Sequence, residues 1–219
     1  MSAKGKLVVV SGFSGAGKGT VMNATIEKYP NFSLSVSATT RKPREGEVDG
    51  REYFFRTREE FEKMIEDDML VEYAQYVGNY YGTPKAYVED QLSKGRDVIL
   101  EIEIQGAMKI KEKFHESLLI FMTPPSGAEL IRRLKGRGTE DDAAIMSRMR
   151  RALEEAEGVG AYDFVLVNEE IEACADHLNE IVVQSKKQGY ERAPERERLE
   201  GIELINKIKS ELEGLVKGE

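Results

Sequence analysis

Gly12-Phe13-Ser14-Gly15-Ala16-Gly17-Lys18 separates the apolar run Lys6–Ser11 from a helical pattern that ends before Pro30. A G-x-x-x-x-G-K sequence between a buried strand and a helix is typical of a P-loop, which binds nucleotide phosphates. Its glycines let backbone N–H groups approach phosphate oxygens, and the helix N-terminus adds partial positive charge. Lys18 can reach the β- and γ-phosphates. A glycine-rich turn that binds no nucleotide is the alternative, but the adjoining strand, helix and lysine favour the P-loop.

The residue after the lysine bears on metal binding. In most P-loops it is Ser or Thr, whose hydroxyl binds Mg²⁺. This chain has Gly19 there and places Thr20 one position later. We therefore expect Thr20 to be a candidate ligand of a magnesium ion that accompanies ATP. The candidate ATP-binding residues of this segment are Gly12, Phe13, Ser14, Gly15, Ala16, Gly17, Lys18, Gly19 and Thr20.

On both sides of this segment the chain alternates expected strands and helices, which indicates a parallel sheet with helices on both faces. Strands are expected at 6–11, 34–37, 97–102, 118–122 and 164–167, and helices at 18–29, 105–113, 126–135, 141–157 and 170–187. Two of the helices are expected to begin with capping boxes, Thr57-Arg58-Glu59-Glu60 and Ser126-Gly127-Ala128-Glu129. A third is expected to start at Thr83-Pro84, with the proline in its first position.

The stretch from about 38 to 92 interrupts this alternation with loops and short strands, at 52–56 and 70–77. The expected architecture is therefore an α/β P-loop core with an inserted α+β lobe and a small mobile lid. We expect the core to comprise residues 1–37, 84–135 and 149–187, the insertion 38–83, the lid 136–148 and a C-terminal helical extension 188–219.

Composition excludes several classes of protein. The chain has 219 residues and a formal net charge of −8, which argues against a general nucleic-acid binder. A single cysteine excludes an internal disulfide framework and a cysteine-based zinc site. Apolar runs are too short for a membrane span or a signal peptide. The expected location is the cytoplasm.

The inserted stretch carries residues suited to a second substrate. Arg41 and Arg44 lie three apart on a polar loop, and guanidinium groups grip phosphate bidentately. A carboxylate such as Glu72 can accept two N–H bonds from a guanine edge, and a hydroxyl such as Ser37 or Thr83 can donate to its O6. Adenine presents the wrong pattern, so such a site would discriminate strongly. Spacing alone leaves open a solvated basic loop and structural roles for the others.

Seven motifs in order, the P-loop segment among them, make the chain resemble the guanylate kinase family from Lys4 to Lys187. The other six are Ser37–Phe55, Glu72–Gln75, Gly78–Thr83, Ile99–Gly106, Arg133–Thr139 and Tyr162–Asn168. The resemblance implies ATP-dependent phosphorylation of GMP, and of dGMP, to the diphosphate by direct in-line transfer. The nucleophile would be an anionic phosphate oxygen, so no general base is required, and alignment with charge stabilisation would carry the catalysis.

The resemblance also implies roles for individual residues. The GMP-binding residues would be Ser37, Arg41, Arg44, Glu47, Tyr53, Glu72, Tyr81, Thr83 and Glu103. The P-loop would be joined in ATP binding by Arg133, Arg137 and Asn168, and the catalytic residues would be Lys18, Arg41, Arg137 and Arg148. Mg²⁺ bound with ATP would be held by Thr20 and Glu101.

Three features of the sequence, at four positions, depart from the family pattern. Phe13 stands where the family usually has proline, and Gly19 where it has Ser or Thr. Glu101 and Glu103 stand where many members have at least one Asp. Each additional methylene moves a carboxylate by over an ångström, which bears on the metal and guanine roles of this pair.

Two other functions remain open from the residues. One is a related P-loop kinase acting on another small phosphate ester, such as a ribose bisphosphate. The other is a non-catalytic, guanylate-kinase-like binding module. An intact P-loop with Lys18 argues against the module, and Glu72 with Ser37 and Thr83 argues for a base-reading site.

The C-terminal tail lies beyond the resemblance. Residues 190–200 read as a charged linker, and 201–216 place Ile205, Ile208, Leu212 and Leu215 on one face of a helix. That face could pack on the chain's own core or on a second subunit, giving a homo-oligomer. Membrane binding is disfavoured because Lys and Arg do not dominate the polar face.

Overall fold

The structure, a computed structural model, describes residues 4–76, 78–136, 142–187 and 192–216. Its core is a five-stranded parallel sheet in the order β2-β7-β1-β8-β9. These strands are β1 (Leu7–Gly12), β2 (Phe32–Leu34), β7 (Asp97–Glu101), β8 (Leu118–Thr123) and β9 (Phe164–Val167). Every residue of the central strands β1 and β8 is buried, as expected for strands covered on both faces.

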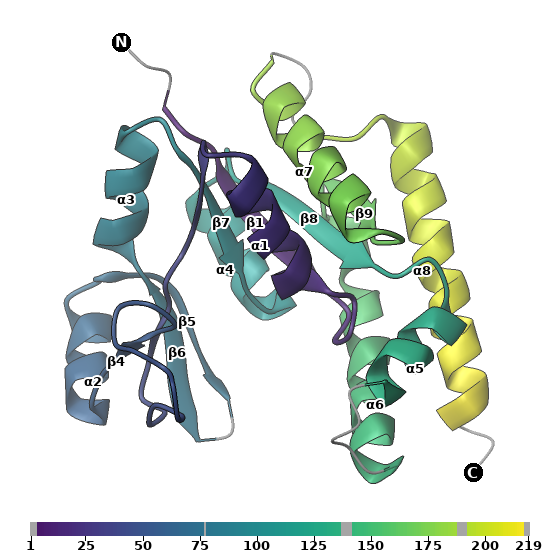
Figure 1. The fold of residues 1–219 in the computed structure, drawn as a ribbon, viewed down its shortest axis with the longest axis horizontal. Helices are drawn as coiled ribbons and strands as arrows, with labels where there is room; N and C mark the ends of the chain where they lie inside the picture. The colour runs from purple at the N-terminus through teal and green to yellow at the C-terminus, as the bar shows by residue number, and fades with distance from the viewer. Residues whose placement is uncertain (1–3, 77, 137–141, 188–191, 217–219) are drawn as a thin grey trace.

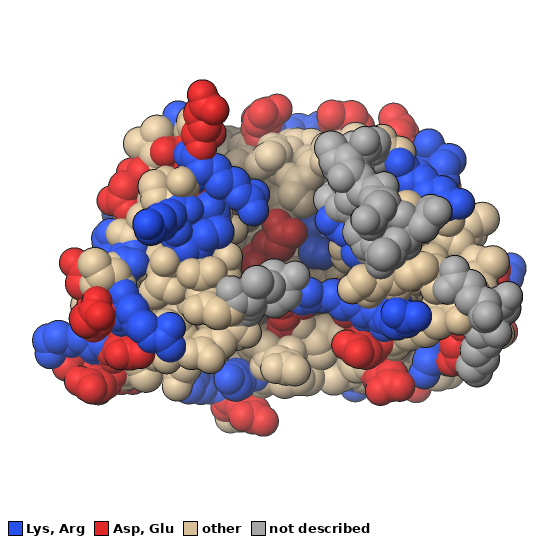
Figure 2. Space-filling model, turned by 90° about the horizontal axis from the view of Figure 1, so that it is seen from below, with Lys and Arg blue, Asp and Glu red and all other residues tan. Residues whose placement is uncertain are grey.

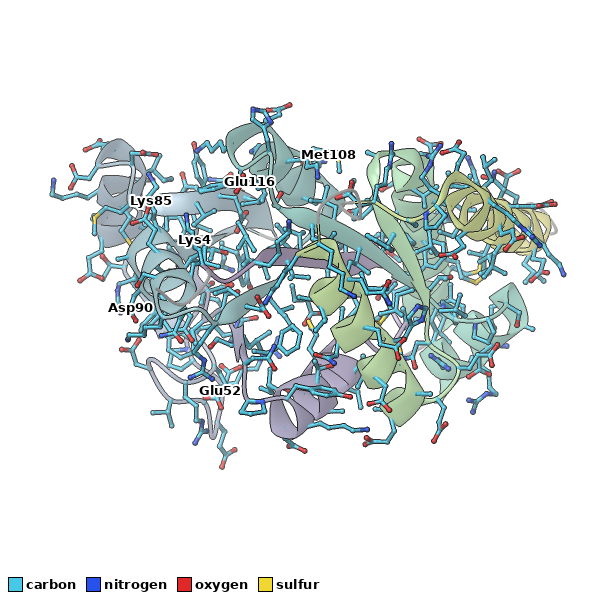
Figure 3. The ribbon with its side chains drawn as sticks, turned by 90° about the horizontal axis from the view of Figure 1, so that it is seen from above. Lys4, Glu52, Lys85, Asp90, Met108 and Glu116 are labelled. Atoms are coloured by element: carbon cyan, nitrogen blue, oxygen red, sulfur yellow. The ribbon has the colours of Figure 1, made fainter. Side chains whose placement is uncertain are left out.

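Helices cover both faces of this sheet. Helices α1 (Lys18–Lys28) and α7 (Ile171–Ser185) pack side by side on one face, and α4 (Ile104–Lys113) lies on the other (Figures 1 and 3). Strands β1 and β7 end beside each other, at Gly12 and Glu101. Because α/β proteins bind their ligands at the carboxyl ends of parallel strands, we expect the site at this edge of the sheet.

A second, four-stranded sheet of order β4-β3-β6-β5 forms the inserted lobe, set apart from the core sheet in Figure 1. Its elements are β3 (Ala38–Thr39), β4 (Phe54–Phe55), α2 (Arg58–Glu66), β5 (Leu70–Tyr76) and β6 (Asn79–Pro84). The hydrophobic core of this lobe is small, with Ala38, Phe61 and Leu70 fully enclosed. The capping box at Thr57 is confirmed, because Thr57 and Glu60 exchange side-chain and backbone hydrogen bonds.

The remaining helices are α3 (Lys85–Ser93), α5 (Gly127–Lys135), α6 (Asp142–Glu157) and α8 (Glu195–Val216), with a short 3₁₀ turn at Val159–Ala161. Helix α8 runs along β9 and packs on α5 and α6 (Figure 1). Its residues Ile205, Ile208 and Leu212 are buried in the chain's own core. The tail therefore packs on its own chain, the first of the two alternatives, and its helix begins at Glu195, within the stretch expected to be a linker.

Three local expectations are wrong. The strand expected at 34–37 ends at Leu34, because Phe32 supplies its buried side chain and the backbone then leaves for the lobe. The helix expected to begin at Thr83-Pro84 begins one residue later, at Lys85, with Pro84 as its N-cap rather than its first residue; Thr83 belongs to β6, and its hydroxyl donates to Glu72 instead of capping. Ser126 caps α5 on one side only, because the carboxylate of Glu129 bonds to arginines.

The expected lid is described in part. Residues 137–141 lie outside the described residues, and the expected lid boundary after residue 148 falls inside the continuous helix α6. Among the described residues, no helix combines the length and apolar content that a membrane span requires.

Candidate active site

The P-loop has the backbone conformation that its glycines predict. Gly12, Gly15 and Gly17 have φ values of 146°, 92° and 89°, which L side chains rarely adopt. The Lys18 ammonium donates to the carbonyls of Gly12 and Phe13, at 2.8 and 3.2 Å, and so folds back over the loop. The loop therefore has the curvature needed to surround a phosphate, with its lysine at the rim.

Phe13 holds the loop on the core rather than facing a ligand. Its ring is fully buried and packs edge-on against Phe121 of β8, with ring centroids 5.2 Å apart. Its backbone carbonyl accepts from Lys18 and from the Ala16 N–H. Phe13 therefore fits in place of the family's proline because its ring packs in the core. Only its backbone atoms could contact ATP.

A cleft of about 610 Å³ lies between the core and the inserted lobe. Figure 2 shows this side of the molecule hollowed near its middle, with acidic and basic side chains inside the hollow. The expected site residues that line the cleft are Gly12, Ser14, Lys18, Ser37, Tyr53, Glu72, Tyr81, Glu101, Glu103 and Arg148. The tertiary structure therefore brings Lys18 and two other P-loop residues into one space with five of the nine expected GMP-binding residues, whereas Gly17, Thr20, Arg133 and Asn168 line a second pocket.

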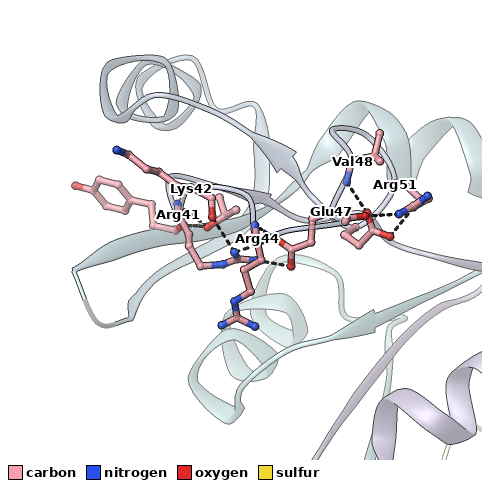
Figure 4. Close-up of polar contacts among 10 residues, drawn as sticks. Arg41, Lys42, Arg44, Glu47, Val48 and Arg51 are labelled. Atoms are coloured by element: carbon pink, nitrogen blue, oxygen red, sulfur yellow. Dashed lines mark hydrogen bonds and ion pairs between the residues drawn. The ribbon is translucent and has the colours of Figure 1, made fainter.

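Arg41 lies on the lobe beside this cleft, with its position set by Glu47 (Figure 4). Two guanidinium nitrogens of Arg41 donate to the two carboxylate oxygens of Glu47, each at 2.9 Å. The Arg41 hydrogen bond and the Arg44 N–H hold the pKa of Glu47 below its usual range. Glu47 thus acts on Arg41 in this structure, whereas the side chain of Arg44 is exposed.

Aromatic rings support the same guanidinium. Arg41 lies 5.2 Å from the ring centroid of Tyr53, and Tyr53 packs edge-on against Tyr81 at 6.1 Å. Burial is the main cause of a raised pKa for the Tyr53 hydroxyl, which therefore stays protonated as a donor at neutral pH. Arg41, Tyr53 and Tyr81 together form a donor cluster suited to a phosphate monoester.

Glu72 lines the cleft and contacts Thr83, which is fully buried and is not part of the cleft lining. Glu72 is only 7% exposed, and its Oε1 accepts from the Thr83 hydroxyl at 3.0 Å. Burial raises the pKa of Glu72, while the Thr83 hydrogen bond and Lys109 oppose the rise. Its second oxygen, Oε2, lies beside Gly106, whose missing side chain leaves that approach narrow but open. A buried carboxylate with a hydroxyl attached is suited to reading a hydrogen-bonding ligand edge.

The two candidate magnesium ligands line different pockets. Glu101 lines the main cleft, and its Oε2 is 3.8 Å from the position a Cβ would take at Gly19. Thr20 lines a separate pocket of about 390 Å³. Glu101 is exposed, but desolvation by its surroundings raises its pKa, and Lys18 opposes the rise. No group of three or more Asp, Glu, His or Cys side chains that could hold a metal ion occurs in the described part of the chain.

Arg133 and Asn168 line the second pocket and hold the P-loop through its backbone. Both side chains donate to the Ala16 carbonyl, at 3.2 and 2.7 Å. Arg133 also donates to Glu129 and to the Asn168 carbonyl, so it is fixed to the core rather than to a lid. Asn168 Oδ1 is buried and accepts no hydrogen bond within the described residues.

Helix α6 contributes residues that the sequence reasoning missed. Arg148, which was expected, donates to the Ser14 hydroxyl at 3.2 Å, but Arg151 and Glu155 also line the cleft. Arg151 forms an ion pair with Glu103 at 2.8 Å, so the carboxylate of Glu103, which was expected to bind GMP, is paired with an arginine of α6 in this structure. In the sequence, the one sign of Glu155 is that its carboxylate borders the apolar residues that α6 buries. Arg137 lies outside the described residues.

A P-loop on a parallel sheet, facing an inserted lobe with its own arginine-based anion site, defines a P-loop protein of the kind that brings two phosphorylated ligands into one cleft. The sequence model of the guanylate kinase family matches residues 4–185. The chain belongs to that family.

Individual relatives agree with this assignment. The chain is 54% identical over 179 residues to a guanylate kinase from Halalkalibacterium halodurans, covering 82% of this chain and 88% of the relative. It is 48% identical over 204 residues to a guanylate kinase from Bacillus subtilis, covering 93% and 100%. A crystal structure of guanylate kinase from Anaplasma phagocytophilum matches with a TM-score of 0.69 at 36% identity, covering 91% of this chain and 95% of that one.

Proposed function

We propose that the chain transfers the γ-phosphoryl group of ATP to GMP, giving ADP and GDP. The observation that supports this function most directly is the buried carboxylate of Glu72, which is hydrogen-bonded to Thr83 and lines one cleft with Lys18 of the P-loop. The P-loop would bind the phosphates of a nucleoside triphosphate. The inserted lobe would bind a second phosphorylated ligand whose base has a polar edge. Family membership supports the same reaction.

We assign the binding roles by position. Arg41, Tyr53 and Tyr81 would hold the GMP phosphate, and Arg44 would join them from its exposed position. Glu72, Thr83 and Ser37 would read the base. Because the acceptor oxygen is already anionic, the chain needs to supply alignment and positive charge rather than a base. Lys18 and Arg148 line the cleft on the side where ATP would bind, and they would stabilise the negative charge that develops on the transferred phosphoryl group.

A magnesium ion is proposed to accompany ATP. Its preferred partners are carboxylate, water and phosphate oxygens, so the residues present fit such an ion in part. Glu101, next to Gly19, is the better placed of the two expected ligands, because Thr20 lines the other pocket. When bound with ATP, the ion would neutralise phosphate charge.

The reaction is tested by coupled ADP formation with Mg²⁺-ATP and a panel of GMP, dGMP, AMP, UMP, CMP and ribose phosphates. We expect turnover with GMP and little with AMP. Lys18→Ala should lower kcat by about 10²- to 10³-fold, the usual loss for one donor to the transferred charge. Glu59→Gln, on the exposed side of α2, is the matched control and should behave as wild type.

Base reading is tested in the same assay. Glu72→Gln replaces one acceptor oxygen with a donor, so kcat/KM for GMP should fall by about 10- to 100-fold, the loss expected of a hydrogen bond to a charged group. Turnover of a ribose phosphate in preference to GMP would favour the related small-molecule kinase. A folded chain with no turnover on any acceptor would favour the non-catalytic binding module.

A further inference from the structure

The cleft contains one nearly buried carboxylate to which the proposed reaction gives no role. Glu155 of α6 is 8% exposed and belongs to the cleft lining. Its Oε2 accepts a hydrogen bond from the Ser14 backbone N–H at 3.1 Å. Ser14 is the third residue of the P-loop segment, so a side chain of α6 is attached directly to the backbone of the phosphate-binding turn.

A second contact ties the same two elements together. The Arg148 guanidinium donates to the Ser14 hydroxyl at 3.2 Å. Arg148 and Glu155 are seven residues apart, which is two helical turns, so they lie on one face of α6. Between them, Arg151 lies 3.5 Å from the Glu155 carboxylate through its Nε. One face of α6 therefore holds Ser14 by its backbone and by its side chain at once.

Building on the proposed function, we propose that Glu155 is a positioning residue for phosphoryl transfer, which fixes the P-loop at Ser14 in register with the arginines of α6. Ser14 and Arg148 both line the cleft that the triphosphate would enter, and they are in contact with each other. Without Glu155, nothing among the described contacts holds the Ser14 N–H, and the contact of Arg148 with the Ser14 hydroxyl is what these contacts leave between Ser14 and α6. A misplacement of about 1 Å far from the reacting atoms is enough to slow an enzyme about 10²-fold.

The charges around Glu155 show that the carboxylate is kept there at a cost to stability. Burial raises its pKa to about 7, although Lys18 of α1, the Ser14 N–H and Arg151 of α6 lower it. Glu103, which precedes α4, raises the pKa of Glu155 further. The charge of Glu155 in turn raises the pKa of the Tyr162 hydroxyl, which follows the 3₁₀ turn. If position 155 contributed only to folding, a neutral or apolar side chain there would make the chain more stable. Titratable groups with shifted pKa values are enriched at functional sites.

The test compares Glu155→Gln, Glu155→Ala and the control Glu154→Gln, which changes the exposed neighbour on the same helix. We expect kcat to fall about 10-fold or more in Glu155→Gln and further in Glu155→Ala, because the amide still accepts from Ser14 but the methyl group cannot. KM for GMP should stay near that of wild type, since Glu155 touches the ATP side. Glu154→Gln should match wild type in every assay.

Thermal unfolding at pH 5 and pH 8 supplies the readout that a structural role would not give. Removing the buried charge should leave Tm of Glu155→Gln at pH 8 equal to or above that of wild type, while its kcat is lower. A loss of Tm in proportion to the loss of kcat would overturn the proposal, and so would full activity in Glu155→Gln. Tighter ATP binding by Glu155→Ala would overturn it too, since the carboxylate would then compete with phosphate.

Titration of wild type and variants with a fluorescent ATP analogue separates this proposal from the proposed function. If wild type shows no GMP-dependent turnover, the proposed function fails. The titration then still tests Glu155, because a loop displaced at Ser14 should bind the analogue about 10-fold more weakly in Glu155→Ala than in Glu154→Gln. Equal binding by these two variants would overturn the positioning role.

Discussion

Arg41 illustrates how single residues are made ready for a ligand. Its two bonds to Glu47 and the ring of Tyr53 leave the guanidinium few alternative orientations. A phosphate that binds there meets an arginine whose side-chain entropy has already been lost on folding. Glu47, expected from the family resemblance to bind GMP, contributes here by holding Arg41.

The first prediction concerns this pair. Glu47→Gln should raise KM for GMP about 10-fold, because the neutral amide no longer pairs with the guanidinium and Arg41 must be ordered by the ligand. The measurement is initial rate against GMP concentration at saturating ATP. Glu45→Gln, an exposed change on the same loop, is the control. Equal KM values for Glu47→Gln and Glu45→Gln would contradict the role given to Glu47.

The same pair predicts a pH dependence of stability. The pKa of Glu47 is lowered on folding, so the ionised carboxylate stabilises the native chain above its ordinary pKa and that stabilisation is lost as pH falls through the lowered value. Tm of wild type should therefore exceed that of Glu47→Gln at pH 7, and the difference should shrink as pH is lowered below 4.5. A difference that grows in acid would show that the sign is wrong.

At the scale of elements, α8 is the clearest test of how the tail is used. Leu212 is fully buried on α8, whereas Leu215, one turn later, is 51% exposed. Leu212→Ala should lower the free energy of unfolding by about 2–5 kcal/mol, as for other buried leucines. Leu215→Ala should change it by about 0.5 kcal/mol or less. Urea unfolding measures both.

The pair of variants also bears on assembly. If the tail serves a homo-oligomer, Leu215→Ala should reduce the molecular mass seen by light scattering while the free energy of unfolding per chain stays nearly the same. An unchanged mass for both variants would leave α8 as part of the chain's own core and refute the oligomer that the apolar face of the tail suggested.

Helix α2 offers a second test at this scale. Thr57 and Glu60 form a complete capping box at its start. Thr57→Ala removes the hydroxyl that accepts the Glu60 N–H, so the free energy of unfolding should fall by about 1 kcal/mol. Thr57→Ser, which keeps the hydroxyl, should fall much less. Equal losses in the two variants would mean that the cap is not what Thr57 contributes.

At the scale of the whole molecule, the two lobes differ in how much core they possess. The core lobe encloses the parallel sheet on both faces, while the inserted lobe has a small enclosed cluster around Phe61. Regions with few buried apolar contacts open at lower free energy. Amide hydrogens of α2 and β4 should therefore exchange faster than those of β1 and β8, as measured by mass spectrometry.

Ligand binding should change that exchange selectively. GMP alone should slow exchange in the inserted lobe, because its proposed contacts are there, and should leave β1 and β8 nearly unchanged. Uniform slowing over both lobes would indicate that GMP closes the molecule without ATP and that the lobes do not act separately.

Local sequence patterns were enough to predict the P-loop, the alternation of strands and helices, and the capping box at Thr57. These features depend on neighbours within a few residues, through glycine conformation, hydrophobic periodicity and side-chain to backbone bonds. The errors at 34–37 and at Thr83 occurred where a distant partner decided the outcome. Thr83 is a good helix cap by its residue type, but Glu72 takes its hydroxyl.

The amino-acid sequence alone determined the phosphate-binding loop, the fold class and, through the motifs, the family. Only the tertiary structure decided that Phe13 is a core residue, that Glu47 serves Arg41, that Thr20 and Glu101 line different pockets, and that Glu155 holds Ser14 from 141 residues away. The physical reason is that burial and pairing depend on which elements pack together. Such contacts join residues that no local spacing relates, and they set whether a carboxylate binds a ligand, orients an arginine or supports a loop.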